Sequence, residues 1–370
     1  MVAKTLAAPM SGVQRPKIGL AFSGGGSRAA AFGLGALRAL HDRNLLGDVE
    51  VVSGISGGSL LSALWAYGPS DFDEFDESVT RLLSRGLQTE LIRRAFSPRR
   101  AAANLTSGVA AALPGRNRRS TRTESLVDTL AARSFGRKTM PEVTQPGLDV
   151  IISATDLSTA NAVRFGSKVS SCSPYGVISE PVPVADAVAA SAAFPALLPQ
   201  LNRSYTFTQS DGTVRRKTML MTDGGIYDNL GLTPLLPGRS SAFTSHVYDL
   251  DYLIAIDAGS GRTTPRAPNR WLFRMKRSLE IAHIRNQDGT RALVHQLAES
   301  GRLKGIVYSY LGMNDARLPR PLKDLVPRQR VFSYRTNFAK MSPENLAALT
   351  TRGEQLTRTL IDAYCPELGR

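Results

Sequence analysis

The sequence has few of the residues that build disulfide frameworks, metal centres or membrane spans. Its 370 residues include two cysteines, Cys172 and Cys365, too few for a disulfide framework, which favours a reducing compartment. Its four histidines show no H-x-x-x-H spacing, and there is no calcium loop of the D-x-D-x-D-G kind, so we expect no metal site. No apolar run reaches the roughly 18–20 residues that span a bilayer, so we expect no transmembrane helix.

The amino-terminal segment lacks a feature of secreted proteins. Residues 1–16 have no continuous apolar stretch of the kind found in a cleavable signal, and we expect them to form a disordered tail. We therefore expect a protein that is cytoplasmic or peripheral at the membrane. Export without a cleaved signal stays open as an alternative.

The charge is strongly of one sign. The formal net charge is +15, which attracts anionic partners such as lipid headgroups or nucleic acid. Residues 91–123 contain no acid and eight arginines: Arg93, Arg94, Arg99, Arg100, Arg116, Arg118, Arg119 and Arg122. Two interpretations of this lid-like segment stay open. It is either a solvated loop or a patch that contacts an anionic membrane, where each basic residue contributes about 1 kcal/mol. We expect no nucleic-acid partner, because the segment has almost no aromatic residues to stack on bases.

Apolar runs alternate with glycine turns and helical patterns at the start of the chain. Residues 17–22 and 50–53 have the composition of buried strands, and apolar helical patterns follow at 27–41 and 58–67. This alternation is typical of a parallel sheet with both faces covered. We predict an α/β fold, a three-layer sandwich with a mainly parallel central sheet and helices on both faces.

Further elements are predicted downstream. We expect strands at 148–155, 218–222, 252–257 and 305–310, a hairpin within 205–218, and helices at 71–87, 183–193, 271–300 and 342–365. The hairpin turn is Ser210-Asp211-Gly212. We interpret residues 17–370 as one domain with a helical carboxyl-terminal part at about 342–365.

A G-x-S-x-G motif follows the second strand. In Gly54-Ile55-Ser56-Gly57-Gly58, the serine is expected on a sharp strand-to-helix turn, the nucleophile elbow. The strained backbone of such a turn needs small neighbours, which the glycines provide, and the helix that follows directs its positive end at the site. Ser56 is therefore the candidate nucleophile. The alternative is an ordinary turn that contains a serine.

Three consecutive glycines, Gly24-Gly25-Gly26, follow the first strand. Glycines let backbone N–H groups approach a developing oxyanion closely, and a helix that begins at once leaves its first N–H groups unpaired. Gly24, Gly25 and Gly26, with Gly57, are the candidate oxyanion hole. Arg28 is a candidate to brace this loop or to add positive charge.

The same loop fits a dinucleotide-binding fingerprint. Gly24, Gly26 and Ala29 match G-x-G-x-x-A, which also requires an acid at the tip of the second strand, roughly 20 residues on. The acid of that strand, Glu50, lies at its wrong end. A nucleotide site is therefore disfavoured.

Asp223, in Thr222-Asp223-Gly224-Gly225, is the candidate base. An aspartate at a strand end beside two glycines could take the proton of Ser56. The alternative is a turn aspartate that caps N–H groups. A triad completed by His246, His283 or His295 fits the chain order of α/β-hydrolases. Against it, His246 lies in the polar segment 244–246, and His283 and His295 lie within predicted helices, so we favour a Ser–Asp pair. Because two helix N-termini are expected at the site, we expect Asp223 to be ionised.

Together the three blocks resemble those of patatin-like phospholipases, the lipid acyl hydrolases related to the catalytic domain of cytosolic phospholipase A2. The resemblance extends over residues 17–258 and includes weaker segments at 154–157, 189–195 and 227–231. Ser23 stands where plant members have an aspartate, a departure that removes no catalytic group.

The resemblance implies a serine lipid acyl hydrolase of the phospholipase A or lysophospholipase type that needs neither calcium nor a cofactor. Ser56 would attack the ester of a phospholipid or another lipid, Asp223 would act as base, and the four glycines would hold the oxyanion. Three alternatives remain: a Ser-His-Asp esterase of the α/β-hydrolase type, a non-catalytic membrane-binding protein and a nucleotide-binding α/β protein.

Overall fold

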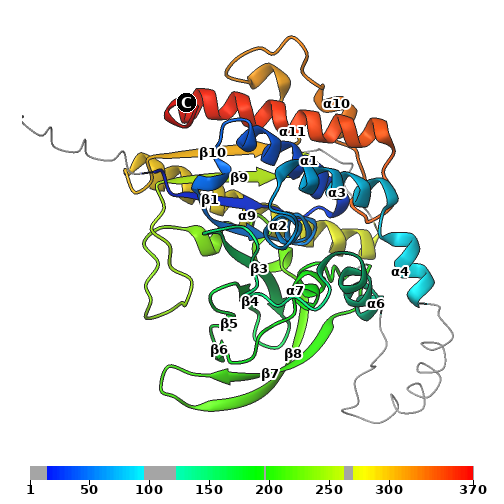
Figure 1. Cartoon of the computed structure of the whole chain (residues 1–370), viewed down its shortest axis with the longest axis vertical. Coiled ribbons are helices and arrows are strands. Elements are labelled where there is room, and N and C mark those ends of the chain that lie inside the picture. Colours follow the sequence, from blue (N-terminus) through cyan, green and yellow to red (C-terminus); the bar gives the residue numbers. More distant parts are fainter. Residues whose placement is uncertain (1–14, 96–121, 196, 262–269, 370) are drawn as a thin grey trace, which may run out of the picture.

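The computed structural model describes residues 15–95, 122–195, 197–261 and 270–369 (Figure 1). Its strands are β1 (Ile18–Phe22), β2 (Val49–Gly54), β3 (Asp149–Asp156), β4 (Asn161–Gly166), β5 (Ser171–Cys172), β6 (Gly176–Ile178), β7 (Leu201–Thr208), β8 (Val214–Asp223), β9 (Tyr252–Asp257) and β10 (Gly305–Tyr310). Its longer helices are α1 (Gly26–His41), α2 (Gly57–Tyr67), α3 (Phe72–Arg85), α4 (Gln88–Ala95), α6 (Arg122–Leu130), α7 (Val184–Ser191), α9 (Trp271–Glu299) and α11 (Pro343–Tyr364). The short helical elements are η1 (Leu46–Asp48), η2 (Ala131–Phe135), α8 (Gly225–Asp228), η3 (Thr233–Leu235), η4 (Asp315–Arg317), α10 (Arg328–Val331) and η5 (Pro366–Leu368).

The strands form one sheet in the order β10-β9-β1-β2-β3-β4-β5-β6-β7-β8. The strands from β10 to β3 in this order run parallel to one another. From β3 onward each neighbouring pair among the described strands is antiparallel. A further antiparallel pairing of β3 with β8 joins the ends of this second half, so that β3 to β8 form a closed ring of pairings.

The prediction of a mainly parallel sheet is therefore wrong. Among the described residues, four strand pairings are parallel and six are antiparallel. The reason lies in the connections, because a parallel pair needs a crossover such as a helix, whereas a tight turn returns the chain antiparallel. Helices join the strands of the first half. Turns and loops, such as the hairpin at Ser210-Asp211-Gly212, join most strands of the second, although α7 lies between β6 and β7.

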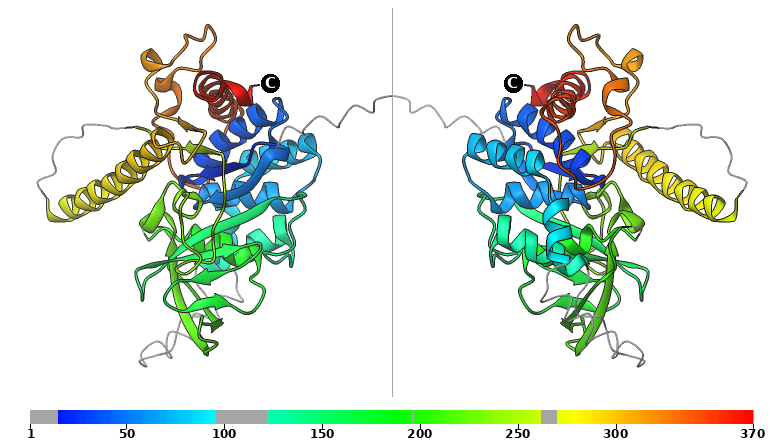
Figure 2. Two further views of the ribbon diagram at one scale, coloured as in Figure 1. Left: turned by 90° about the vertical axis from the view of Figure 1, so that its left-hand side faces the viewer. Right: turned by 90° about the vertical axis from the view of Figure 1, so that its right-hand side faces the viewer.

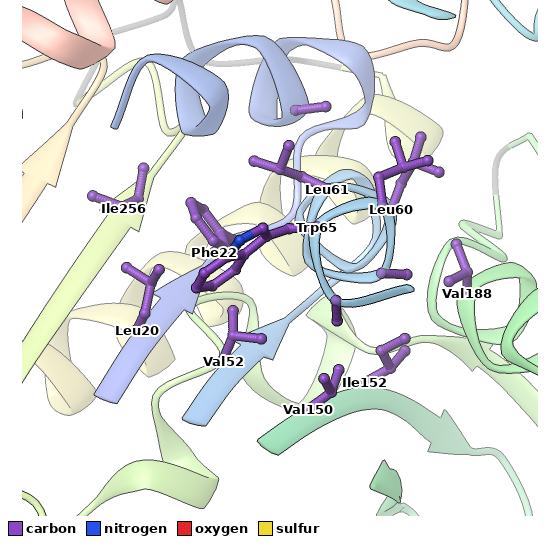
Figure 3. Close-up of a cluster of buried hydrophobic side chains, with 14 of the residues drawn as sticks. Leu20, Phe22, Val52, Leu60, Leu61, Trp65, Val150, Ile152, Val188 and Ile256 are labelled. Carbon is purple, nitrogen blue, oxygen red and sulfur yellow. The ribbon is translucent and has the colours of Figure 1, made fainter. Parts of the chain in front are cut away.

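Helices cover both faces of the parallel half. One face carries α1, α2 and α11, and the other is covered by α9 and the segment 230–250 (Figures 1 and 2). Between the sheet and α2 lies a core that includes Phe22 and Trp65 (Figure 3). The helix α1 is apolar nearly all round because it lies between the sheet and α11. At Gly35 a Cβ atom would lie 1.9 Å from the Thr350 carbonyl oxygen of α11, so the two helices approach too closely for a side chain.

Most elements predicted from the sequence are confirmed. The strands before the two glycine motifs, the buried strands β9 and β10, the β7–β8 hairpin and the long helices α9 and α11 lie where they were expected. The strand expected at 218–222 is the second part of β8, and β4, β5 and β6 were not predicted. In the part of the chain that the structure describes, no helix has the length and apolar character needed to cross a bilayer.

Candidate active site

The glycine loop and Ser56 lie side by side because β1 and β2 are neighbouring parallel strands. In the register of this pair, Phe22 lies opposite Gly54, so the turns that follow the two strands leave the same edge of the sheet. Asp223 reaches this edge from the antiparallel half, at the end of β8, where it pairs with Ala154 of β3. The structure thus brings together three motifs that are distant in the sequence.

Ser56 has the strained backbone of a nucleophile elbow. Its φ of 52° and ψ of −115° lie in a region that costs a non-glycine residue about 1–3 kcal/mol. The turn has no room for larger neighbours, because a Cβ at Gly57 would lie 2.0 Å from the Gly26 carbonyl oxygen. A Cβ at Gly58 would lie 2.4 Å from the carbonyl oxygen of Phe22. The glycines are therefore required by the close approach of the two turns.

The hydroxyl of Ser56 lies close enough to the Asp223 carboxylate to lower the pKa of that carboxyl group. Both residues are buried, with 8% of Ser56 and 5% of Asp223 exposed. Asp223 Oδ1 also accepts the N–H of Gly225 at 2.7 Å. Burial raises the pKa of Asp223 to about 6 from its ordinary 3.8, and the hydrogen bonds from Gly225 and Ser56 oppose this rise. The carboxylate is thus a stronger base than a solvated aspartate and is still ionised at neutral pH.

Ser191, the last residue of α7, connects the nucleophile to the base. Its Oγ accepts the Ser56 N–H at 2.9 Å, and its carbonyl oxygen accepts the Gly224 N–H at 3.2 Å. The Asp223 N–H donates to Ala193 O at 3.1 Å, so the end of α7 fixes both turns. Sequence reasoning did not assign Ser191 a role. The only signal for it was its place in the segment 189–195 of the family resemblance.

The three glycines of the loop are not equivalent. Gly25 and Gly26 have φ values of 149° and 60°, which favour glycine. Within the described part of the chain, no acceptor is found for the N–H groups of Gly25, Gly26 and Gly57. The Gly24 N–H, by contrast, donates to Asn229 O at 3.0 Å. Because the Gly24 N–H already has a partner, Gly25, Gly26 and Gly57 are the better placed oxyanion donors, and a role for Gly24 stays a prediction.

Arg28 braces the helix that follows the glycine loop. Its Nη1 donates to Tyr334 O at 2.9 Å and to Ser260 Oγ at 3.1 Å. Burial lowers the pKa of Arg28, and the negative charge of Asp257 partly offsets this effect. Of the two roles considered from the sequence, these contacts favour the bracing one.

The three candidate histidines occupy different environments. His246 is buried against Ser171 Oγ at 3.2 Å, and burial lowers its pKa to about 3, so it is neutral at physiological pH. His295 is exposed on α9. His283 lies beside the turn that carries Asp223, because the Gly225 backbone contributes to its pKa. Its Nε2 lies 2.9 Å from the Gln287 side-chain nitrogen, and burial lowers its pKa. Among the described residues, none of the three is hydrogen-bonded to Ser56 or Asp223.

Most of the arginines proposed as membrane contacts lie outside the described residues. These are Arg99, Arg100, Arg116, Arg118 and Arg119. Arg93 is exposed on α4 and pairs with the buried carboxylate of Glu90 at 3.1 Å. Arg94 lies on the same helix, and Arg122 begins α6 as an exposed residue. A membrane role for this set stays a prediction.

Comparison with known proteins shows the family to which this chain belongs. Residues 20–236 match the family model of the patatin-like phospholipases. Because the match covers more than half of the chain, the chain belongs to this family, and the resemblance stated from its motifs is confirmed. No curated protein sequence matches the chain.

One solved structure shares the fold of this chain. Human GIVD cytosolic phospholipase A2 is 15% identical, with a TM-score of 0.57 over 94% of this chain and 59% of that chain. The present chain thus spans about 59% of the length of the human protein. VipD from Legionella pneumophila is 16% identical over 94% of this chain and 67% of that chain, with a TM-score of 0.41, a similarity too low to carry an argument.

Proposed function

We propose that the protein is a serine lipid acyl hydrolase of the phospholipase A or lysophospholipase type. The observation that carries the proposal is the approach of the Ser56 hydroxyl to the buried carboxylate of Asp223, whose pKa it lowers, beside backbone N–H groups that have no acceptor among the described residues. A weak nucleophile, a base within hydrogen-bonding reach and oxyanion donors are the components of acyl transfer. Membership of the patatin-like family supports a lipid ester as the substrate.

The proposed reaction has two halves. In the first, Asp223 takes the proton of Ser56 as the serine oxygen bonds to the ester carbonyl carbon, and the oxyanion accepts N–H groups of Gly25, Gly26 and Gly57. Collapse breaks the ester bond, and the departing alcohol or lysolipid takes the proton from Asp223. In the second half, Asp223 takes a proton from water, whose oxygen attacks the acyl-enzyme. The fatty acid then leaves, and the proton returns to Ser56.

The electrostatics of the site support the assignment of roles. The helices α1 and α2 begin at the two glycine turns, so the positive ends of both dipoles lie where the oxyanion would form. The Asp223 pKa of about 6 makes the carboxylate a base that is ionised near neutrality. The mechanism uses only side chains and backbone groups of this chain. We propose that catalysis is independent of calcium and occurs at a membrane surface.

Hydrolysis of a soluble p-nitrophenyl ester tests this proposal. We expect Ser56→Ala and Asp223→Asn each to abolish turnover without loss of the fold, checked by circular dichroism. Asp211→Asn, in the exposed β7–β8 turn, is the matched control and should retain full activity. Near-normal turnover by Asp223→Asn would remove Asp223 from the role of base. Loss of activity on addition of EDTA would contradict calcium independence.

A further inference from the structure

The amino-terminal half of α9 exposes large apolar side chains. The second half of the helix is anchored, because Val294 is buried in the core on the face of the sheet that α9 covers. The first half extends away from the body (Figure 2). Four large apolar side chains in the first half are exposed: Trp271 at 68%, Phe273 at 56%, Met275 at 47% and Ile281 at 49%. Apolar groups gathered on one projecting element mark an interaction surface.

The same stretch is strongly basic. Residues 270–285 contain five cations, Arg270, Arg274, Lys276, Arg277 and Arg285, and a single acid, Glu280. Glu280 pairs with Arg277 at 3.2 Å, while Arg270, Arg274 and Arg285 are exposed. Exposed aromatic and aliphatic side chains bury apolar area in a bilayer, and the basic residues beside them are attracted to anionic lipids. Its net positive charge disfavours pairing with the same segment of a second copy.

The helix α9 is also connected to the turn that carries the candidate base. His283 lies beside Gly225, whose backbone contributes to its pKa, and Asn286 Nδ2 donates to Tyr227 O at 2.8 Å. Gly225 in turn donates its N–H to Asp223 at 2.7 Å. The exposed segment thus begins about three turns of helix before His283 and Asn286, the residues that contact α8. The helix α8 itself lies next to Asp223.

We propose that residues 270–285, the docking segment, form the surface through which the protein binds an anionic lipid membrane. The amino-terminal turn of α9, with Trp271, Phe273 and Met275 around it, enters the boundary between headgroups and acyl chains, and the arginines contact lipid phosphates. Docking here places α8 and Asp223 close to the membrane that holds the substrate. This inference rests on the proposed lipid acyl hydrolase function, but binding can be measured without turnover.

Tryptophan fluorescence tests the docking segment directly, because the chain has two tryptophans and Trp65 is buried in the core. With vesicles of phosphatidylcholine and phosphatidylglycerol, we expect a blue shift that comes from Trp271 and is absent in Trp271→Phe. Vesicles of phosphatidylcholine alone should give a much weaker shift. Using Ser56→Ala as the background prevents hydrolysis during the titration, so binding is read separately from the proposed chemistry.

Co-sedimentation with the same vesicles measures how strongly each variant partitions onto the membrane. Phe273→Ala should weaken partitioning by on the order of tenfold, the effect of removing one large apolar side chain from a buried position. Arg274→Gln should weaken it by roughly fivefold. Tyr364→Ala, which removes another exposed helical aromatic on α11, should bind like the wild type. All three variants should retain wild-type turnover of a soluble ester.

Three outcomes would overturn the inference. The first is vesicle binding that is unchanged in Phe273→Ala and Arg274→Gln. The second is binding that does not depend on phosphatidylglycerol. The third is a dimer in sedimentation velocity that Phe273→Ala abolishes without any effect on vesicle binding, which would assign the surface to a second copy. Failure of the soluble-ester assay in the wild type would instead contradict the proposed function and leave the binding result to be judged on its own.

Discussion

Replacement of the candidate base should make the protein more stable at neutral pH. Burial raises the pKa of Asp223 to about 6 from an ordinary 3.8, so the folded state holds this proton more tightly than the unfolded state does. Between these two values the folded state binds more protons, and stability therefore falls as pH rises. Above pH 6 the ionised carboxylate costs the fold about 3 kcal/mol, from roughly two pKa units at about 1.4 kcal/mol each.

Asp223→Asn removes this charge and keeps the shape of the side chain. Its oxygen can still accept the Gly225 N–H, which in the wild type donates to Asp223 Oδ1 at 2.7 Å. At pH 8 we expect the free energy of unfolding of the variant to exceed that of the wild type by up to about 3 kcal/mol, and its melting temperature to be higher. The difference between the two proteins should shrink toward zero near pH 4.

Thermal and urea unfolding of both proteins across this pH range provides the measurement. Asp211→Asn, in the exposed turn, is the control and should show no such pH-dependent gain. A variant that is less stable than the wild type at pH 8, or a difference that does not change with pH, would refute the reasoning. It would mean that Asp223 is not held as a buried, ionised group.

Other predictions follow from the same geometry. The kcat/KM for a soluble ester should rise with pH through an apparent pKa of about 6 and then level off, and a rate that is flat from pH 5 to 8 would contradict titration of the Asp223 carboxylate. Gly57→Ala should reduce turnover by at least about 10²-fold or prevent folding, because its Cβ would lie 2.0 Å from the Gly26 carbonyl oxygen. Gly47→Ala is the control and should behave like the wild type, because no atom lies within 4 Å of the added Cβ. His283→Ala should reduce kcat by less than about tenfold, since a general base would be worth about 10²–10⁴-fold, and a loss in that range would favour the Ser-His-Asp alternative.

The sequence predicts best where a motif follows a buried strand. The turns after β1, β2 and β8 were placed correctly because apolar strands and glycines mark them, and the parallel order of β1 and β2 follows from the helices that connect strands. In the antiparallel half the β7–β8 hairpin was predicted but β4, β5 and β6 were not, and β5 and β6 have only two and three residues, too short for a periodic pattern. Pairing of β3 with β8 depends on tertiary contacts that no local pattern encodes.

The electrostatics of the site illustrate the same limit. The sequence suggested that two helix dipoles keep Asp223 ionised, and it could not show how deeply the carboxylate is buried, which is the dominant influence on its pKa. Likewise the triple glycine predicted a loop of donors, but only the folded chain pairs Gly24 with Asn229. The role of Ser191 as a link between nucleophile and base required the position of α7.

The pairing of Ser56 with Asp223 as nucleophile and base is the central claim. Its most direct test is reaction with a fluorophosphonate probe, followed by mass-spectrometric mapping of the modified residue in the wild type and in Asp223→Asn. The account predicts phosphonylation at Ser56 in the wild type and labelling slower by about 10² or more in the variant. Modification of a different serine, or labelling of Ser56 at the same rate in both proteins, would contradict it.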